Sequence, residues 1–176
     1  MSERSELEAM LEANRRYAAA FRGGGRPAAP ARRVAILTCM DSRIHLEEAL
    51  GLDIGDAHMI RNAGGRASDD AIRSLIISSR LLGTAEFAVV HHTDCGLVRF
   101  TNDELRARLR AETGADASHI DFLPFADLRG SVVEDVERIL ASPLVDPQIP
   151  VSGWIYDVDT AVLEQVSPPA TRAGRR

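Results

Sequence analysis

The sequence contains no lysine and only two cysteines. All 21 of its basic residues are arginine, which excludes mechanisms that need a lysine nucleophile or the lysine of a phosphate-binding P-loop. Two cysteines, Cys39 and Cys95, are too few for a disulfide-rich secreted scaffold. They can form one bridge, lie in the core as inert thiols, or supply part of a metal site, and the choice among these decides the function.

Long apolar runs and an excess of positive charge are also missing. No apolar run approaches the 18 residues of a membrane span. The first residues, Met-Ser-Glu-Arg-Ser-Glu, lack the apolar stretch of a signal peptide, so we expect a cytoplasmic location. With 26 acidic and 21 basic residues, the net charge is −5, which argues against nucleic acid and membrane surfaces as partners. A chain of 176 residues that is 45% hydrophobic is sufficient for one domain with a real core.

Short apolar strands alternate with helical patterns through the middle of the chain. The predicted strands cover residues 34–37, 57–60 and 87–90, with a hairpin or turn-containing strand over 151–158 and 161–166. The predicted helices cover 69–82, a segment that follows the capping box of residues 101–104, and 132–140. This alternation predicts an α/β fold, a single domain with a central, mainly parallel β-sheet flanked by helices.

The two ends of the chain differ from this pattern. Apolar residues at helical spacing over 7–21 predict an N-terminal helix that ends at the glycines of 23–25. This helix can pack on a partner subunit or on its own domain. We expect residues 1–31 to form the helix and a Gly/Pro/Ala linker, 32–166 the functional domain, and 167–176 a disordered tail.

Both cysteines follow predicted strands, Cys39 after 34–37 and Cys95 after 87–90. Ligands of open α/β sheets bind at this edge. His92 precedes Cys95 by three residues, so one tight loop can turn both side chains toward one ion. Two thiolates and one imidazole suit Zn²⁺, and three protein ligands leave the open fourth position of catalytic zinc sites. The alternative is a buried thiol beside an unrelated histidine.

Further polar residues and glycines surround these ligands. Asp41 lies two residues after Cys39 and can reach the fourth zinc position or a water held there. Arg43 can form a bidentate pair with Asp41, although a surface pair worth little is the simpler interpretation. Gly64 and Gly65 lie in a turn whose backbone can approach a ligand closely.

Three motifs in this order resemble those of the β-class carbonic anhydrases: Cys39-Met40-Asp41-Ser42-Arg43, Arg61-Asn62-Ala63-Gly64 and His92-Thr93-Asp94-Cys95-Gly96. The resemblance extends over residues 32–158. Plant-type members usually carry glycine where this chain has His91, so the chain resembles the compact, non-plant-type branch.

The resemblance implies one zinc ion per chain, bound by Cys39, His92 and Cys95. It implies that Asp41 and Arg43 form the catalytic dyad and that Asp41 is a fourth zinc ligand only in a closed state. It also implies a homodimer or a dimer of dimers, in which the N-terminal helix packs on the partner subunit.

The implied reaction is reversible hydration of carbon dioxide to bicarbonate and a proton through a zinc-bound hydroxide, with activity that rises with pH. We expect Ala63, Gly64 and Gly65 to lie beside the small apolar substrate. Candidate proton shuttles are the histidines other than the ligand, although a structural role is favoured for His91: His45, His58, His91 and His119.

Two alternatives remain. The same zinc site can hydrolyse carbonyl sulfide or carbon disulfide. A zinc or redox regulatory protein is the alternative from a different class, with Cys39 and Cys95 as a redox-sensing pair.

Overall fold

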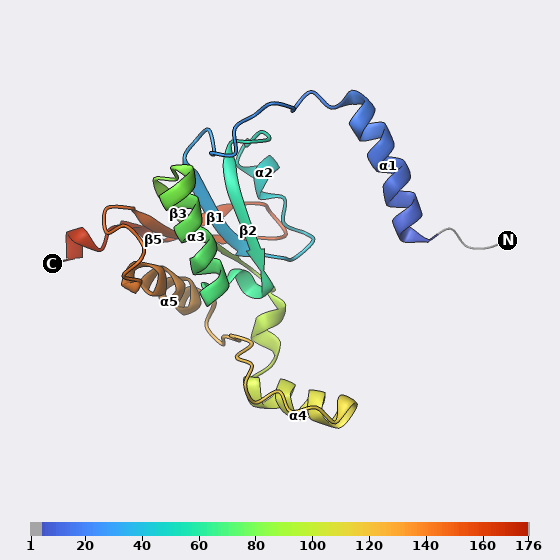
Figure 1. Cartoon of the computed structure of the whole chain (residues 1–176). Coiled ribbons are helices and arrows are strands. Elements are labelled where there is room, and N and C mark those ends of the chain that lie inside the picture. Colours follow the sequence, from blue (N-terminus) through green and yellow to red (C-terminus); the bar gives the residue numbers. More distant parts are fainter. Residues whose placement is uncertain (1–4, 176) are drawn as a thin grey trace.

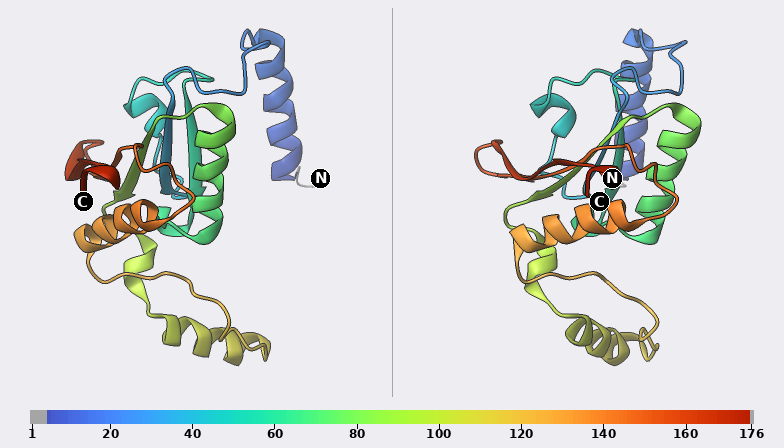
Figure 2. Two further views of the ribbon diagram at one scale, coloured as in Figure 1. Left: turned by 60° about the vertical axis from the view of Figure 1, so that its left-hand side comes forward. Right: turned by 90° about the vertical axis from the view of Figure 1, so that its left-hand side faces the viewer.

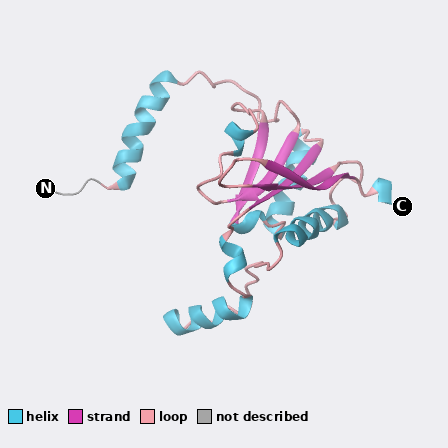
Figure 3. Ribbon diagram, turned by 180° about the vertical axis from the view of Figure 1, so that it is seen from behind, coloured by secondary structure: helices cyan, strands magenta, loops and turns pink. Residues whose placement is uncertain are grey.

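The computed structural model describes residues 5–175. Their strands form one five-stranded sheet, with helices around it (Figure 3). The strands follow the spatial order β2-β1-β3-β4-β5. They are β1 (Val34–Cys39), β2 (Ala57–Asn62), β3 (Glu86–His92), β4 (Val151–Tyr156) and β5 (Leu163–Ala170). The first four pair in parallel, whereas β5 runs antiparallel to β4. The predicted α/β fold with a central, mainly parallel sheet is confirmed.

Two helices pack on one face of this sheet (Figure 1). Helix α3 (Asp69–Leu82) begins after Ser68, whose side chain accepts a hydrogen bond from the Ala71 amide, and ends at Gly83. Gly83 has a φ of 75°, the left-handed conformation that glycine adopts most easily. Helix α5 is Leu128–Ala141. The apolar core beneath both helices includes Leu37, Leu75, Phe87, Val89, Val136 and Ile139.

The opposite face carries a second apolar cluster around the short helix α2 (Leu46–Ala49). Ile36 and Val90 point to this face, while their neighbours in sequence Leu37 and Val89 belong to the first core. Strands buried on both faces read as continuous apolar runs, which is why residues 34–37 and 87–90 were recognisable as strands.

Helix α1 (Glu6–Ala20) stands apart from the rest of the chain (Figures 1 and 2). Ser5 caps it in a capping box with Glu8. None of its residues is buried, and its apolar side chains, such as Leu7 at 65% and Met10 at 64%, are largely exposed. The predicted helix is present, and it does not pack on its own domain.

Helix α4 (Asn102–Thr113) also projects from the body, with the following segment returning beside it (Figure 2). Thr101 and Glu104 form the predicted capping box. The Asn102 side chain accepts a hydrogen bond from the Phe122 amide at 2.9 Å and donates one to Asp121 at 2.8 Å. These contacts tie the returning segment to the start of the helix.

The C-terminal region corrects one expectation. Residues 167–176 were expected to be disordered, but β5 continues to Ala170, which pairs with Val151. The guanidinium of Arg172 then donates to the carbonyl oxygens of Ser142 and Val145. Proline is tolerated in this strand because β5 lies at the edge of the sheet. The short helix η3 (Ala173–Arg175) follows, and residue 176 lies outside the described part of the chain.

Within residues 5–175, no helix is both long enough and apolar enough to cross a membrane. The carboxyl ends of the four parallel strands meet at one edge of the sheet, where Cys39 is in register with Asn62 and His92 with Tyr156. Two further short helices follow strands at this edge, η1 (Ala63–Gly65) after β2 and η2 (Gly96–Arg99) after β3.

Candidate metal centre

Cys39, His92 and Cys95 come together at the carboxyl edge of the sheet. Cys39 is the last residue of β1, His92 is the last residue of β3, and Cys95 follows in the next loop. Their candidate ligand atoms all lie within 4.8 Å of one another, and all three residues are buried. The structure thus brings together the three ligands expected from the sequence.

The hydrogen bonds of His92 leave one ring nitrogen free for a ligand. Its Nδ1 lies 2.8 Å from the carbonyl oxygen of Thr93. A carbonyl oxygen only accepts, so Nδ1 carries the proton and Nε2 of the neutral ring is a lone-pair donor. Nε2 is buried and has no hydrogen-bond partner among the described residues. This is the arrangement by which proteins fix the tautomer and orientation of a metal-binding histidine.

The two thiols differ in their electrostatic surroundings. A hydrogen bond from Cys95 holds the pKa of Cys39 well below its usual value, against the opposing effect of burial. The same hydrogen bond and burial raise the pKa of Cys95. The backbone N–H of Gly64 also donates to the Cys39 sulfur at 3.2 Å. The pair therefore favours a thiolate at Cys39 over one at Cys95, and a bound cation would stabilise both sulfurs as thiolates.

These donors fit zinc. Two thiolates and one imidazole are the soft and borderline ligands that Zn²⁺ prefers. The unpartnered, buried Nε2 of His92 is otherwise a cost to folding, and a metal ligand would remove that cost.

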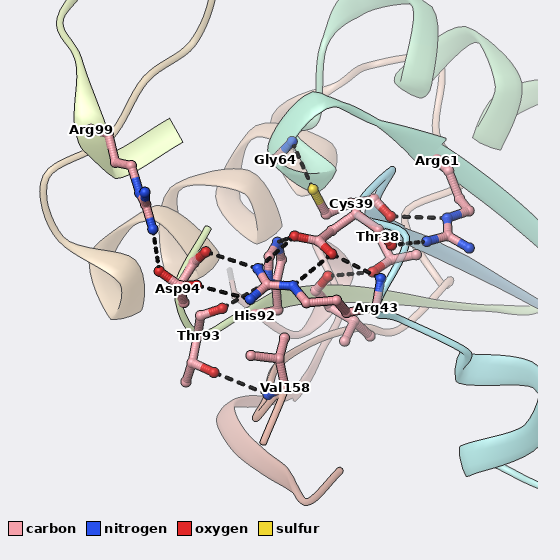
Figure 4. A network of polar contacts seen from close by, with 12 residues as sticks. Thr38, Cys39, Arg43, Arg61, Gly64, His92, Thr93, Asp94, Arg99 and Val158 are labelled. Carbon is pink, nitrogen blue, oxygen red and sulfur yellow. Dashed lines mark hydrogen bonds and ion pairs between the residues drawn. The ribbon is translucent and has the colours of Figure 1, made fainter. Parts of the chain in front are cut away.

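Asp41 and Arg43 form a bidentate ion pair beside this cluster. Figure 4 shows Arg43 close to the ligand residue His92. Arg43 Nη2 lies 2.7 Å from Asp41 Oδ2, and Arg43 Nε lies 3.0 Å from Asp41 Oδ1. The Arg43 backbone N–H also donates to Oδ1 at 2.9 Å. Hydrogen bonds from the Arg43 side chain hold the pKa of Asp41 well below its usual range. Asp41 Oδ2 is 3.9 Å from His92 Nε2, so the paired carboxylate sits at the edge of the ligand cluster.

The turn after β2 packs tightly against the end of β1. Gly64 and Gly65 have φ values of 78° and 67°, in the left-handed region. A Cβ atom on Gly65 would lie 2.9 Å from the carbonyl carbon of Thr38, and one on Gly64 would lie 2.3 Å from a methyl group of Leu97. Gly65 is required because its backbone lies against that of β1, and both positions have a positive φ that favours glycine. Contact of Ala63, Gly64 and Gly65 with substrate stays a prediction.

Sequence reasoning gave no role to Arg61 or Asp94, and the structure places both at the site. Arg61 Nε donates to the carbonyl oxygen of Cys39 at 2.9 Å, and Arg61 Nη2 donates to that of Asp41 at 2.7 Å. Asp94 accepts a hydrogen bond from Arg43 Nη1 at 2.8 Å. Both residues belong to the recognised motifs, but their partners become visible only when the strand ends meet.

His91 has no route to solvent. It is fully buried, with Nδ1 2.9 Å from Ser131 Oγ and Nε2 3.0 Å from Asp135 Oδ2. This agrees with the structural role favoured for it. Among the other shuttle candidates, His58 contacts Ser78 and the Ala28 carbonyl oxygen, whereas His45 and His119 are exposed.

Comparisons with known proteins point to one family. A family model described as carbonic anhydrase matches residues 34–121. β-Carbonic anhydrase 1 of Mycobacterium tuberculosis (strain H37Rv) is 40% identical over 154 residues, which cover 86% of this chain and 92% of that protein. A carbon disulfide hydrolase of Saccharolobus solfataricus is 37% identical over 158 residues, covering 76% of this chain and 77% of that protein. The crystal structure of a carbonic anhydrase from Streptococcus mutans superposes with a TM-score of 0.89 at 49% identity, covering 93% of this chain and 99% of that chain.

Proposed function

The chain belongs to the β-carbonic anhydrase family, and from that premise we propose that it is a zinc enzyme that hydrates carbon dioxide reversibly to bicarbonate and a proton. The observation that carries this proposal is the buried cluster of Cys39, His92 and Cys95 with the Asp41–Arg43 pair at its edge. A purely structural zinc site has no use for a carboxylate held next to the ligands by a bidentate arginine.

Cys39 Sγ, His92 Nε2 and Cys95 Sγ would hold one zinc ion per chain. When bound, zinc supplies a Lewis acid that lowers the pKa of a water molecule at the open position. Two thiolates donate more electron density than two imidazoles, so we expect this water to be less acidic than at a site of three histidines. Activity should therefore rise with pH.

Asp41 is the residue placed to orient the nucleophilic water. Its carboxylate is ionised because hydrogen bonds from Arg43 lower its pKa, so it accepts a hydrogen bond rather than donating one. Arg43 fixes the direction of the acceptor oxygens with two parallel hydrogen bonds. If Arg43 released it, Asp41 could turn toward the metal and fill the open position, which would switch the enzyme off.

Carbon dioxide is small and apolar, and offers few groups for recognition. We propose that Ala63, Gly64 and Gly65 lie beside it. Gly64 already contacts the Cys39 sulfur through its backbone N–H, so the turn that it belongs to borders the metal ligands.

We propose a homodimer as the basic assembly, able to pair into a dimer of dimers. Helix α1 has exposed apolar side chains and contacts no core of its own chain. Figure 1 shows α1 and α4 projecting on the side of β2, an edge strand of the sheet. A hollow of about 350 Å³ lies there between β2 and α3, lined in part by Met59, Ile60 and Ile77. A second copy would cover these surfaces.

The assembly is tested by light scattering after gel filtration. Leu7→Ser combined with Leu11→Ser should convert the dimer into monomer, because both side chains would leave an apolar interface. If the double variant remained a dimer of unchanged stability, helix α1 would not contribute to the dimer interface.

We also place the enzyme in the cytoplasm, because two free thiols as metal ligands need reducing conditions.

The experiment that tests the function combines metal analysis with stopped-flow assays. The purified protein should contain one zinc per chain and hydrate carbon dioxide with a rate that increases with pH. Cys39→Ser should lose the zinc and the activity together. Carbonyl sulfide and carbon disulfide are assayed side by side, because relatives such as the Saccharolobus protein are named carbon disulfide hydrolases. A much higher kcat/KM for a sulfur substrate would overturn the proposal, as would zinc without any activity.

A further inference from the structure

Arg43 lies between two carboxylates that come from different strand ends (Figure 4). Asp41 follows β1, and Asp94 lies in the loop after β3 between the ligands His92 and Cys95. The guanidinium therefore bridges the two segments that supply the metal ligands. Asp94 therefore contacts the site through Arg43 and is not one of the three clustered ligand residues.

The two carboxylates use different N–H groups of Arg43. Nε and one N–H of Nη2 point to Asp41, at 3.0 and 2.7 Å. Nη1 points to Asp94 Oδ2 at 2.8 Å, and Nη2 also donates to the Asp94 carbonyl oxygen at 3.1 Å. Asp94 thus adds restraints to the guanidinium without displacing either of its contacts with Asp41.

Asp94 is itself held in place. Its φ is 53°, in the left-handed region that aspartate and asparagine tolerate better than most residues. Arg99 Nη2, from helix η2, donates to Asp94 Oδ1 at 2.6 Å. The result is a chain of contacts from Arg99 through Asp94 and Arg43 to Asp41.

We propose that Asp94 is a positioning residue that holds the Arg43 guanidinium against Asp41 and so keeps the Asp41 carboxylate off the metal. The inference rests on the proposed zinc site. The Arg43 side chain is 45% exposed, and an isolated pair at such exposure stabilises little. Asp41 Oδ2 is only 3.9 Å from His92 Nε2, so an unrestrained carboxylate would stay close to a group that would bind the ion.

The test measures access to the metal directly. The protein is loaded with Co²⁺, and azide is titrated while the visible d–d absorption of the ion is recorded. Asparagine tolerates the left-handed backbone conformation as aspartate does, so Asp94→Asn removes the charge without adding backbone strain. It should leave metal content unchanged, weaken azide binding by about fivefold and lower kcat by a similar factor. Arg99→Ala should shift both values in the same direction by less.

A double-mutant cycle shows whether Asp94 acts through Arg43. Arg43→Met alone should weaken azide binding at least as much as Asp94→Asn, and Asp94→Asn added to Arg43→Met should change nothing further. The matched control is Asp70→Asn, because Asp70 is also an exposed aspartate that contacts an arginine at 2.8 Å, away from the site. It should leave azide binding unchanged.

The outcomes separate this inference from the proposed function. Azide affinity within about twofold of the parent in Asp94→Asn would overturn the positioning role, and so would a full effect of Asp94→Asn in the Arg43→Met background. Azide binding to the cobalt protein needs no turnover of carbon dioxide. If the parent protein fails to hydrate carbon dioxide, the azide titrations still decide the role of Asp94.

Discussion

The guanidinium of Arg66 lies 3.3 Å from the carboxylate of Asp135, and the two side chains are only 4% and 1% exposed. Asp135 Oδ2 is also 3.0 Å from His91 Nε2, and the ring of Phe125 lies 5.5 Å from the Arg66 guanidinium carbon. Asp135 belongs to α5, His91 precedes the ligand His92 on β3, and Arg66 follows the glycine turn. These three buried residues therefore join α5, β3 and the segment that follows the glycine turn.

Removing one partner of this pair should be costly. Asp135→Ala removes the buried carboxylate beside Arg66 and His91, and leaves Glu134, 2.8 Å from Arg66 Nη2, as the remaining partner of the guanidinium. The free energy of unfolding should fall by about 2 kcal/mol. Chemical denaturation of the zinc-loaded protein measures the loss. The control is Glu164→Ala, which removes an exposed pair with Arg129 at 2.8 Å and should cost less than about 0.5 kcal/mol. Equal losses in the two variants would contradict the importance of the buried pair.

Asp41→Ala separates catalysis from metal binding. The three zinc ligands remain, so zinc content should equal that of the parent. The variant has no carboxylate to orient the water, and kcat should fall by about 100-fold. Zinc analysis and stopped-flow hydration on the same preparation check both parts. Full activity in Asp41→Ala would show that the assignment of the Asp41–Arg43 dyad is wrong.

The metal centre could be predicted because its ligands lie in two short sequence motifs. Cys39 and Asp41 lie in one short motif and His92 and Cys95 in another, and each motif follows an apolar strand. Parallel strands carry their carboxyl ends to one edge, so two local patterns predict one shared site. The bidentate pairing of Asp41 with Arg43 followed from the same short spacing.

The contacts that were missed join residues far apart in sequence. Arg66, His91 and Asp135 carry no pattern that links them, and only the packing of α5 on β3 brings them together. The continuation of β5 to Ala170 was hidden because its prolines are typical of irregular segments, yet an edge strand accepts them. The projection of α1 is clear in the structure, but its apolar spacing alone does not distinguish packing on its own domain from packing on a partner.

Gly65→Ala should destabilise the protein and loosen the metal centre. The new methyl group would meet the backbone of β1 at 2.9 Å from the Thr38 carbonyl carbon and 3.0 Å from the Cys39 nitrogen, and neither atom can move without shifting a ligand. Gly83→Ala is the matched control, because Gly83 has a similar φ of 75° and no atom within 4 Å of the position of a Cβ. Gly83→Ala should cost about 1 kcal/mol from backbone strain alone. Gly65→Ala should cost more and should also weaken zinc binding, measured by competition with a chelator. If Gly65→Ala and Gly83→Ala lost the same stability and zinc affinity were unchanged, the backbone at Gly65 would not be in close contact with β1.

The stability of the α4 projection should depend on pH through Asp121. A hydrogen bond from the Asn102 side chain, helped by the Leu123 amide, lowers the pKa of Asp121 in the folded protein. The unfolded chain therefore binds a proton at a higher pH than the folded chain does. The contribution of Asp121 is present above its ordinary pKa of about 3.9 and is lost as pH falls through the lowered folded value. Protection of α4 amides in hydrogen exchange should thus fall as pH drops from about 5 to 2. Asp121→Asn removes the titrating group and Asn102→Ala removes the main cause of the shift, so both should weaken this dependence. Glu104 and Asp116, whose pKa values are also lowered by hydrogen bonds at α4, should supply what remains. A parent-like dependence in either variant would mean that another group controls the acid stability of α4.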